Sequence, residues 1–256
     1  MTTDPEPLLS IITVTDDPSG ADFGITRDSL QAIGAVPEVE WLVVPAEPSA
    51  MTGPVNARIL PPCNDGIYPA MNAGLDAAKG TYVWFLNGGD QLAGQDALTA
   101  VLAACRDGQA DFIYGDTLVV RNGLPEPVLK TARDHRDWHK GMFAHHQAMI
   151  YRRARIGEQR FDNRYSIASD YHFTIRHLLT AEHVIRLDLP LCRYAEGGLS
   201  EQHMALGARE QARIRRHDFA VDPWTNLRVL LWQHGSRRLR CWAPSLWFRL
   251  RHRWTG

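Results

Sequence analysis

A short polar loop, Asn87-Gly88-Gly89-Asp90, directly follows an apolar run and offers atoms that can do chemistry. The carboxylate of Asp90 is a hard oxygen ligand of the kind that Mg²⁺ or Mn²⁺ prefers. The two glycines allow the main chain to approach a ligand closely, because neither residue carries a Cβ. The same four residues also make an ordinary turn with a solvated aspartate. On spacing alone, the turn is the favoured interpretation.

A second carboxylate, Asp170, stands at the start of residues 169–179, whose pattern predicts a helix. A carboxylate in that place can accept a proton as a general base. It can equally stabilise the helix, with Ser169 as the N-cap and Asp170 in the first turn. From the residues alone, helix capping is the favoured interpretation.

Other polar residues give weaker signals. Asp65 precedes a helical pattern and is either an N-cap or a ligand contact. The pair His145-His146 invites a metal or acid/base interpretation, although such a pair more often makes structural hydrogen bonds. The four cysteines lie far apart and form no metal-binding spacing, which predicts reduced and mostly buried thiols.

These residues need strands and helices to position them. Residues 8–15 and 39–44 are apolar, β-branched runs that predict buried strands, and residues 57–60 predict a short third strand. Residues 81–86 predict the strand that ends at the Asn87–Asp90 loop. Later strands are expected at 111–114, at 117–130 around a turn, and at 183–189.

Helices are expected between these strands. The spacing of apolar residues predicts a helix over 67–78, and further helices are expected at 26–33, 96–106 and 169–179. Alternating strands and helices are typical of an α/β fold with a mostly parallel, wound sheet. Ligands bind such sheets at the carboxyl ends of the strands, where the Asp90 loop would lie.

The charge is unevenly distributed along the 256 residues. Residues 205–256 carry 11 arginines against three acidic residues, a net charge of +8, while the whole chain carries −1. The first residues do not resemble a secretory signal, and no apolar run approaches the ~20 residues that span a bilayer. We therefore expect a cytoplasmic protein whose basic end meets an anionic partner.

The segment 64–92, NDGIYPAMNAGLDAAKGTYVWFLNGGDQL, resembles the core of family 2 glycosyltransferases, most closely those of colanic acid and other exopolysaccharide pathways. Further patches follow in the same order: residues 12–15, IYGD at 113–116, HQA at 146–148, SDY at 169–171 and GGLS at 197–200. The resemblance covers about residues 8–205. It implies a GT-A fold, a mixed and mostly parallel Rossmann-like sheet flanked by helices, and an inverting transferase that uses a nucleoside diphosphate sugar.

The resemblance also assigns roles to residues. Asp90 takes the place of the family's metal-binding DXD motif, with Asn87 in the other acidic position, and would hold Mn²⁺ or Mg²⁺ beside a UDP- or GDP-sugar. Asp170 becomes the general base. The donor-binding set is Thr13, Val14, Thr15, Asp65, Gly66, Asn72, Asn87, Gly88, Gly89 and Asp90. The sugar or acceptor cleft would include His146, Gln147, Gly198 and Ser200, with His203 as a further metal ligand.

The sequence also departs from the family. Residues 44–48, Val-Pro-Ala-Glu-Pro, replace an Asp-Gly pair that helps to hold the base or ribose, and Asp16-Asp17 replaces a Tyr-Asn pair. The base, uridine or guanosine, therefore stays open. Two rival functions are a degenerate transferase acting as a scaffold and a sugar nucleotidyltransferase. The second would need a glycine-rich loop with Arg or Lys after the first strand, which residues 16–20 lack.

We expect two parts, a GT-A domain at 1–205 and a basic, Trp-rich helical tail at 206–256. Residues 236–256 hold six Arg, three Trp and one Phe with no acid, and Pro244 interrupts them. Such a segment favours an anionic membrane surface, while a self-packed helix is the alternative. No nucleic-acid-binding module accompanies the charge. A membrane-bound tail suits an enzyme that extends a lipid-linked glycan.

Overall fold

The structure, a computed structural model, describes residues 6–48, 56–121, 125–198 and 202–242. Its strands are β1 (Leu9–Thr15), β2 (Val39–Pro45), β3 (Arg58–Ile59), β4 (Tyr82–Phe85), β5 (Gln91–Leu92), β6 (Phe112–Val120), β7 (Val128–Lys130), β8 (Met149–Arg152) and β9 (Val184–Ala195). Its α-helices are α1 (Ala21–Gln31), α2 (Ile67–Ala77), α3 (Gln95–Asp107), α4 (Arg153–Ile156), α5 (Ser169–Leu178), α7 (Met204–Arg213) and α8 (Pro223–Trp242). Short 3₁₀ or π turns are η1 (His135–Lys140), η2 (His146–Ala148) and η3 (Ile214–Asp218).

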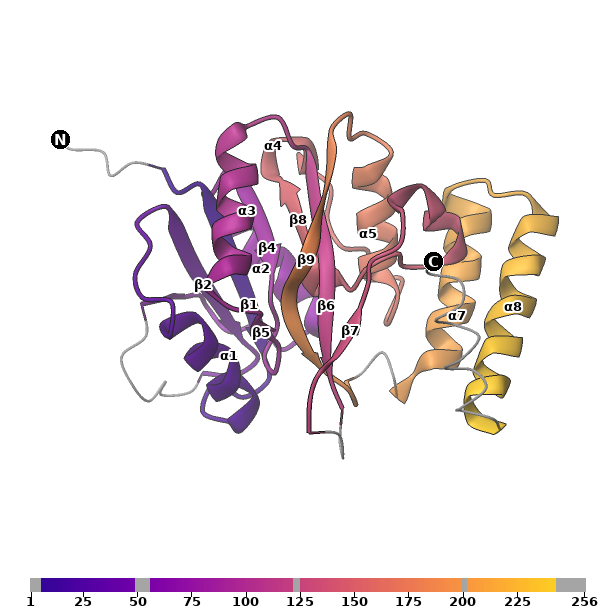
Figure 1. Ribbon diagram of the computed structural model, residues 1–256, viewed down its shortest axis with the longest axis horizontal. Helices are drawn as coiled ribbons and strands as arrows, with labels where there is room; N and C mark the ends of the chain where they lie inside the picture. Colours follow the sequence, from indigo (N-terminus) through magenta and orange to yellow (C-terminus); the bar gives the residue numbers. More distant parts are fainter. Residues whose placement is uncertain (1–5, 49–55, 122–124, 199–201, 243–256) are drawn as a thin grey trace.

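The strands form one mixed sheet in the order β3-β2-β1-β4-β8-β6-β9-β5, with β7 beside β6. In this sheet β1, β2, β3, β4, β6 and β9 run in one direction, and β5, β7 and β8 run in the other. The first four strands are therefore a parallel, Rossmann-like half (Figure 1). The expected α/β fold with a mixed, mostly parallel sheet is confirmed.

Helices cover both faces of the sheet. On one face α2 and α5 share a core with alternate residues of β1, β2, β4 and β8, such as Ile12, Leu42 and Phe85. On the other face α1 and α3 pack against the remaining residues of these strands, such as Ile11 and Trp84. Both faces of β1 are thus buried, which explains its unbroken apolar sequence.

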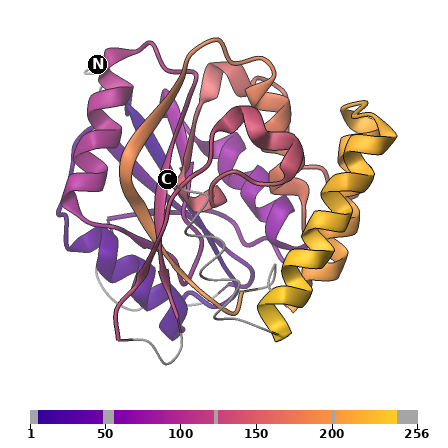
Figure 2. The ribbon, with the colours of Figure 1, turned by 45° about the vertical axis from the view of Figure 1, so that its right-hand side comes forward.

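The long helix α8 lies outside α7 and forms one edge of the molecule (Figures 1 and 2). The segment before it is not separate from the core, because Ile214 belongs to the cluster beneath α2 and α5 and Arg215 is fully buried. The guanidinium Nε of Arg215 donates to Oδ1 of Asn226 over 2.9 Å, which joins η3 to α8. Among the described residues, none of the helices has the length and apolarity needed to cross a bilayer.

Most of the expected elements are present, but their ends differ in two instructive places. Helix α1 begins at Ala21, five residues before the expected start. Ser169 is not the N-cap of α5: the cap is Ala168, whose carbonyl accepts the amide of His172 over 3.1 Å. Ser169 is therefore the first residue of the helix, and the interpretation of Ser169 as its N-cap is wrong. The thiols of Cys105 and Cys192 are buried and unpaired, as expected.

Candidate functional site

The loops after β1, β2 and β4 meet at one edge of the sheet. The amide of Gly88 donates to the carbonyl of Val14 over 2.9 Å, and the amide of Ala46 donates to the carbonyl of Thr15 over 2.8 Å. Because the three strands are parallel, their carboxyl ends lie side by side. The structure thus brings together two of the predicted donor-binding groups, residues 13–15 and 87–90.

The two glycines of the Asn87–Asp90 loop are favoured for different reasons, the backbone conformation at Gly89 and the lack of space at Gly88. Gly89 has φ +92°, a conformation that residues with a Cβ rarely adopt. A Cβ on Gly88 would lie 3.0 Å from Oγ1 of Thr15, closer than such contacts normally come. The amide of Asp90 donates to the carbonyl of Asn87 over 3.0 Å and closes the turn. The loop is therefore a tight turn whose backbone lies against the end of β1.

Thr26 of α1 fixes this loop in place. Its hydroxyl donates to the carbonyl of Asp90 over 2.6 Å and accepts the amide of Gly89 over 3.0 Å. The Gly89 amide also bonds to the carbonyl of Asp22 over 3.0 Å. Thr26 is fully buried. Nothing in the sequence marks Thr26 as part of the site, because its partner lies 64 residues away.

Asp90 is a buried carboxylate with few donors around it. The residue is 6% exposed, and burial raises the pKa of its carboxyl to about 7, although a hydrogen bond from the Gln147 side chain opposes this. Gln147 lies in η2, and its carbonyl accepts the indole N–H of Trp84 over 2.7 Å. Gln147 therefore connects the predicted ligand Asp90 to the predicted cleft residues.

The oxygens of this loop fit a divalent cation. Oδ1 of Asn87 is buried and has no hydrogen-bond partner among the described residues. Together with the Asp90 carboxylate it provides two hard oxygen ligands within four residues, and substrate phosphates and water would complete the coordination. No group of three or more His, Cys, Asp or Glu ligands occurs in the described parts of the chain. His203, exposed at the N-cap of α7, stays a predicted ligand.

Several residues that were predicted to bind the nucleotide-sugar donor have other surroundings in the fold. Oγ1 of Thr13 is buried and accepts the indole N–H of Trp41 over 3.0 Å. The side-chain amide of Asn72 makes two bonds to the main chain of Phe161, at 3.0 and 2.8 Å. Asp65 is exposed, and Gly66, with φ 112°, takes the N-cap place of α2. The donor roles of Thr13 and Asn72 stay predictions, and their side chains already have partners.

Asp170 lies half-buried in the first turn of α5. Burial raises the pKa of its carboxyl to about 6, against the amide of Tyr171, which donates to Oδ1 over 2.7 Å. The hydroxyl of Tyr68 in α2 lies beside it and donates to the carbonyl of Ile167 over 2.7 Å. The helix that carries Asp170 packs on β4, since the rings of Phe173 and Phe85 are 6.2 Å apart.

The predicted cleft residues divide into three groups. His146 is 6% exposed, its ring stacks on Phe85 at 5.4 Å, and burial lowers the pKa of its imidazole to about 3, so the ring is neutral and packed in the core. Gln147 is half-buried, and its side chain bonds to the carboxyl of Asp90. Gly198 is exposed after β9, while Ser200 lies outside the described residues.

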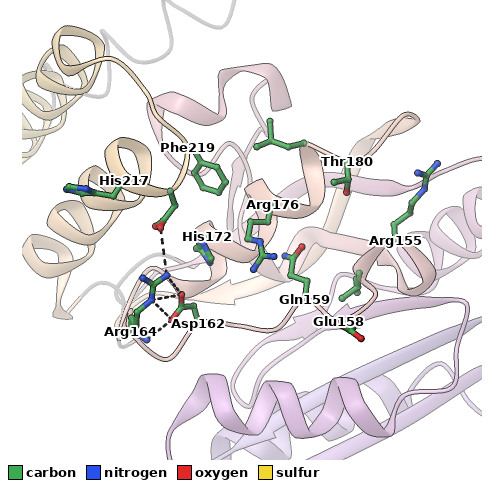
Figure 3. A pocket seen from close by; sticks show the side chains of 13 residues that line it. Arg155, Glu158, Gln159, Asp162, Arg164, His172, Arg176, Thr180, His217 and Phe219 are labelled. Carbon is green, nitrogen blue, oxygen red and sulfur yellow. Dashed lines mark hydrogen bonds and ion pairs between the residues drawn. The ribbon is translucent and has the colours of Figure 1, made fainter.

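A separate pocket of about 970 Å³ lies on the outer side of α5 (Figure 3). It is lined by α4 and the residues after it, by His172 and Arg176 of α5 with residues 179–180 after it, and by residues 217–219. Arg164 lies between Asp162 and Asp218, at 2.6 and 3.8 Å from their carboxylate oxygens. None of the predicted site residues lines this pocket.

Comparison with known proteins supports the predicted class. Residues 56–172 match the model of the family described as glycosyl transferase family 2. A PGL/p-HBAD biosynthesis glycosyltransferase of Mycobacterium tuberculosis is 32% identical over 144 residues, and its Mycobacterium bovis counterpart matches equally. The match covers 54% of this chain and 54% of each relative, so it extends over about half the length of these curated proteins.

Solved structures show the fold. S. aureus TarS 1–349 in complex with UDP-GlcNAc has a TM-score of 0.60 at 20% identity, over 93% of this chain and 75% of that one. The mannosyltransferase PcManGT from Pyrobaculum calidifontis, in complex with GDP-Man and Mn²⁺, has a TM-score of 0.57 at 15% identity, over 88% and 68%. The fold is that of GT-A glycosyltransferases, as the sequence analysis predicted.

The hydroxyl of Thr26 provides a test of how the Asp90 loop is held. Thr26→Val keeps the shape of the side chain but leaves the Gly89 amide without one of its acceptors. We expect a loss of about 1–2 kcal/mol in unfolding free energy, measured by urea denaturation. The control Thr26→Ser keeps the hydroxyl and should lose clearly less. If Thr26→Val is as stable as the unmodified protein and only Thr26→Ser loses stability, the methyl group, and not the hydrogen bonds, holds the loop.

Proposed function

We propose that this protein is a family 2 glycosyltransferase that moves a sugar from a nucleoside diphosphate sugar to a hydroxyl of a glycan acceptor. The observation that carries the proposal is the tight loop of residues 87–90, set against the end of β1 with a buried carboxylate at Asp90. The family match over residues 56–172 includes this loop. Structures of similar fold contain UDP-GlcNAc in one case and GDP-Man with Mn²⁺ in another.

In this proposal the loop handles the diphosphate leaving group. Asn87 and Asp90 would hold Mn²⁺ or Mg²⁺, which supplies positive charge to the departing phosphate oxygens. The two glycines leave no side chain between the main chain of the loop and a diphosphate. Because Asp90 is buried with few donors, its ionised form is destabilised, and a bound cation would stabilise that form.

Asp170 would be the catalytic base. Its carboxylate accepts the proton of the acceptor hydroxyl while that oxygen forms a bond to the anomeric carbon and the bond to the diphosphate breaks. Attack from the face opposite the leaving group inverts the anomeric configuration. A carboxyl with a pKa of about 6 is ionised at neutral pH and is still a useful proton acceptor, which suits a general base.

The finer substrate assignments in this proposal rest on the resemblance of the sequence alone. The base of the donor is uridine or guanosine, and the acceptor is a glycan, lipid-linked in this proposal, within polysaccharide synthesis of the exopolysaccharide kind. We place the enzyme in the cytoplasm at the inner face of the membrane. We assign transfer to residues 1–205 and membrane contact to residues 206–256.

An exposed apolar face on α8 supports the membrane contact. Trp224, Leu227, Leu231 and Trp232 lie within one side of the helix and are 75%, 45%, 62% and 62% exposed, while Val229 on the other side is buried. Aromatic and leucine side chains on a surface helix settle at the depth of lipid headgroups. The six arginines that follow in residues 236–256 would attract anionic lipid.

Donor binding is tested by thermal unfolding with UDP- and GDP-sugars, with and without Mn²⁺. We expect one nucleotide class to raise the melting temperature by about 5 °C at saturating concentration, and only when the metal is present. Asp90→Asn should lose the metal-dependent part, whereas the control Asp96→Asn in the first turn of α3 should keep it. A response to nucleoside triphosphate alone would favour a nucleotidyltransferase, and no response to any nucleotide would favour a scaffold.

The role of Asp170 is tested by transfer kinetics. We expect Asp170→Asn to lower kcat by about 10²–10⁴-fold while the KM for the donor changes less than about twofold, because the proton acceptor is lost and the donor site is not. In the unmodified enzyme kcat/KM should fall below a pH of about 6, as Asp170 becomes protonated. Near-normal turnover in Asp170→Asn would exclude it as the base.

The apolar face of α8 is tested by vesicle sedimentation with the full chain. The double variant Trp224→Ser/Leu231→Ser should bind phosphatidylglycerol vesicles at least about tenfold more weakly than the unmodified protein. The control Leu179→Ser removes an equally exposed leucine elsewhere and should bind normally. If the unmodified protein binds neither phosphatidylglycerol nor phosphatidylcholine vesicles at low salt, the membrane contact is wrong.

A further inference from the structure

The main chain just before α5 is held by a single carboxylate from a distant helix. Glu210 of α7 accepts three successive amides, from Ser166 to Oε1 and from Ile167 and Ala168 to Oε2, each over 2.9 Å. Three converging N–H donors are the arrangement with which proteins bind an anion. Here the anion is the protein's own side chain, so the arrangement fixes the conformation of this stretch of backbone.

The middle residue of these three, Ile167, is also held by helix α2. The carbonyl of Ile167 accepts the hydroxyl of Tyr68 in α2 over 2.7 Å, while its amide bonds to Glu210. Helix α7 comes close at this point, because a Cβ on Gly207 would lie 3.1 Å from Cγ2 of Ile167. Asp170 follows Ala168 by two residues, so its main chain starts from a doubly anchored segment.

Glu210 also acts on Asp170 through its charge. Burial is the largest cause of the raised pKa of Asp170, the amides of Tyr171 and of Asp170 itself oppose it, and the negative charge of Glu210 raises it further. The hydroxyl of Tyr68 in α2 opposes the rise, and the buried Tyr151 of β8 also interacts with the Asp170 charge. Among these groups Glu210 is the other carboxylate near Asp170.

We propose that Glu210 is a positioning residue for sugar transfer, which holds the start of α5 through its three amide bonds and places a second carboxylate near Asp170. This inference rests on the proposed role of Asp170 as the base. It makes helix α7 part of the catalytic machinery, although the resemblance to family 2 glycosyltransferases ends near residue 205. The segment 206–256 then has a function in the site in addition to any contact with a membrane.

The test measures the carboxyl of Asp170 directly and needs no activity. In protein labelled with ¹³C-aspartate, the Asp170 signal is assigned by its loss in Asp170→Asn and is titrated with pH. Glu210→Gln keeps an acceptor oxygen but removes the charge, so we expect the pKa of Asp170 to fall by an amount on the order of half a unit. The control Glu182→Gln, an exposed carboxyl that pairs with Arg155, should leave it unchanged.

Transfer kinetics give the second readout. The acid limb of kcat/KM should move to lower pH in Glu210→Gln, since Asp170 then ionises at lower pH. Glu210→Ala should lower kcat by about tenfold or more with a smaller change in the donor KM, and Glu210→Asp should recover part of kcat. An unmoved Asp170 titration in a folded Glu210→Gln protein overturns the inference. Absence of transfer in the unmodified protein with a normal titration shift would instead count against the proposed function.

Discussion

The hydrogen bond from the amide of Gly88 to the carbonyl of Val14 sets the position of the Asn87–Asp90 loop, which carries the proposed metal ligands, against the end of β1. It extends the pairing of β1 and β4 by one step beyond the strands, so the Asn87–Asp90 loop turns directly over the end of β1. The absence of a Cβ at Gly88 favours this position, since a Cβ there would lie 3.0 Å from Oγ1 of Thr15. With the loop in this place, the hydroxyl of Thr26 reaches both Gly89 and Asp90. A carboxylate at position 90 is thereby fixed through its main chain, and its side chain is left with few donors.

Glycines also allow close packing beneath the site, where α2 and the turn before β4 lie against β1. A Cβ on Gly74 would lie 2.4 Å from Cγ2 of Ile12, and one on Gly80 would lie 2.5 Å from the amide of Ser10. Helix α2 therefore packs on β1 through a glycine, and the turn into β4 crosses β1 through another. These contacts bring Tyr68, on the first turn of α2, close to the main chain before α5. The close contacts at Gly74 and Gly80, where a larger residue would not fit, and the hydrogen bond from Tyr68 thus join the parallel half of the sheet to the helix that carries Asp170.

The sequence predicted those parts of the fold whose signal lies within one segment. The runs that became β1, β2 and β4 and the apolar stripe of α2 needed no distant partner to be recognised. The strand β8 was missed, because Met149–Arg152 is short and is a strand only by pairing between β4 and β6. The site shows the same division. The loop at Asp90 was noted for its glycines and its place after a strand, and its ligand role was predicted from the resemblance to family 2 glycosyltransferases. Thr26, Gln147 and Glu210, by contrast, act on residues 42 to 64 positions away. Neither spacing nor residue type marks such contacts, since each depends on how two segments meet in the folded chain.

The carboxylates of Asp90, Asp111 and Asp170 differ in the groups that surround them, and their pKa values shift in different directions as a result. Asp111 is 1% exposed, yet its pKa lies below the ordinary value: burial raises it, but the amides of Glu182 and His183 and the guanidinium of Arg155 lower it more. It is a satisfied anion that ties the start of β9 to α4. The Gln147 side chain acts on the carboxyl of Asp90, and two main-chain amides and the Tyr68 hydroxyl act on that of Asp170, but burial outweighs these donors and raises the pKa of both carboxyls. The fold therefore provides enough donors for the carboxylate that only supports it. The raised pKa values of Asp90 and Asp170 agree with the roles proposed for them, a metal ligand and a general base.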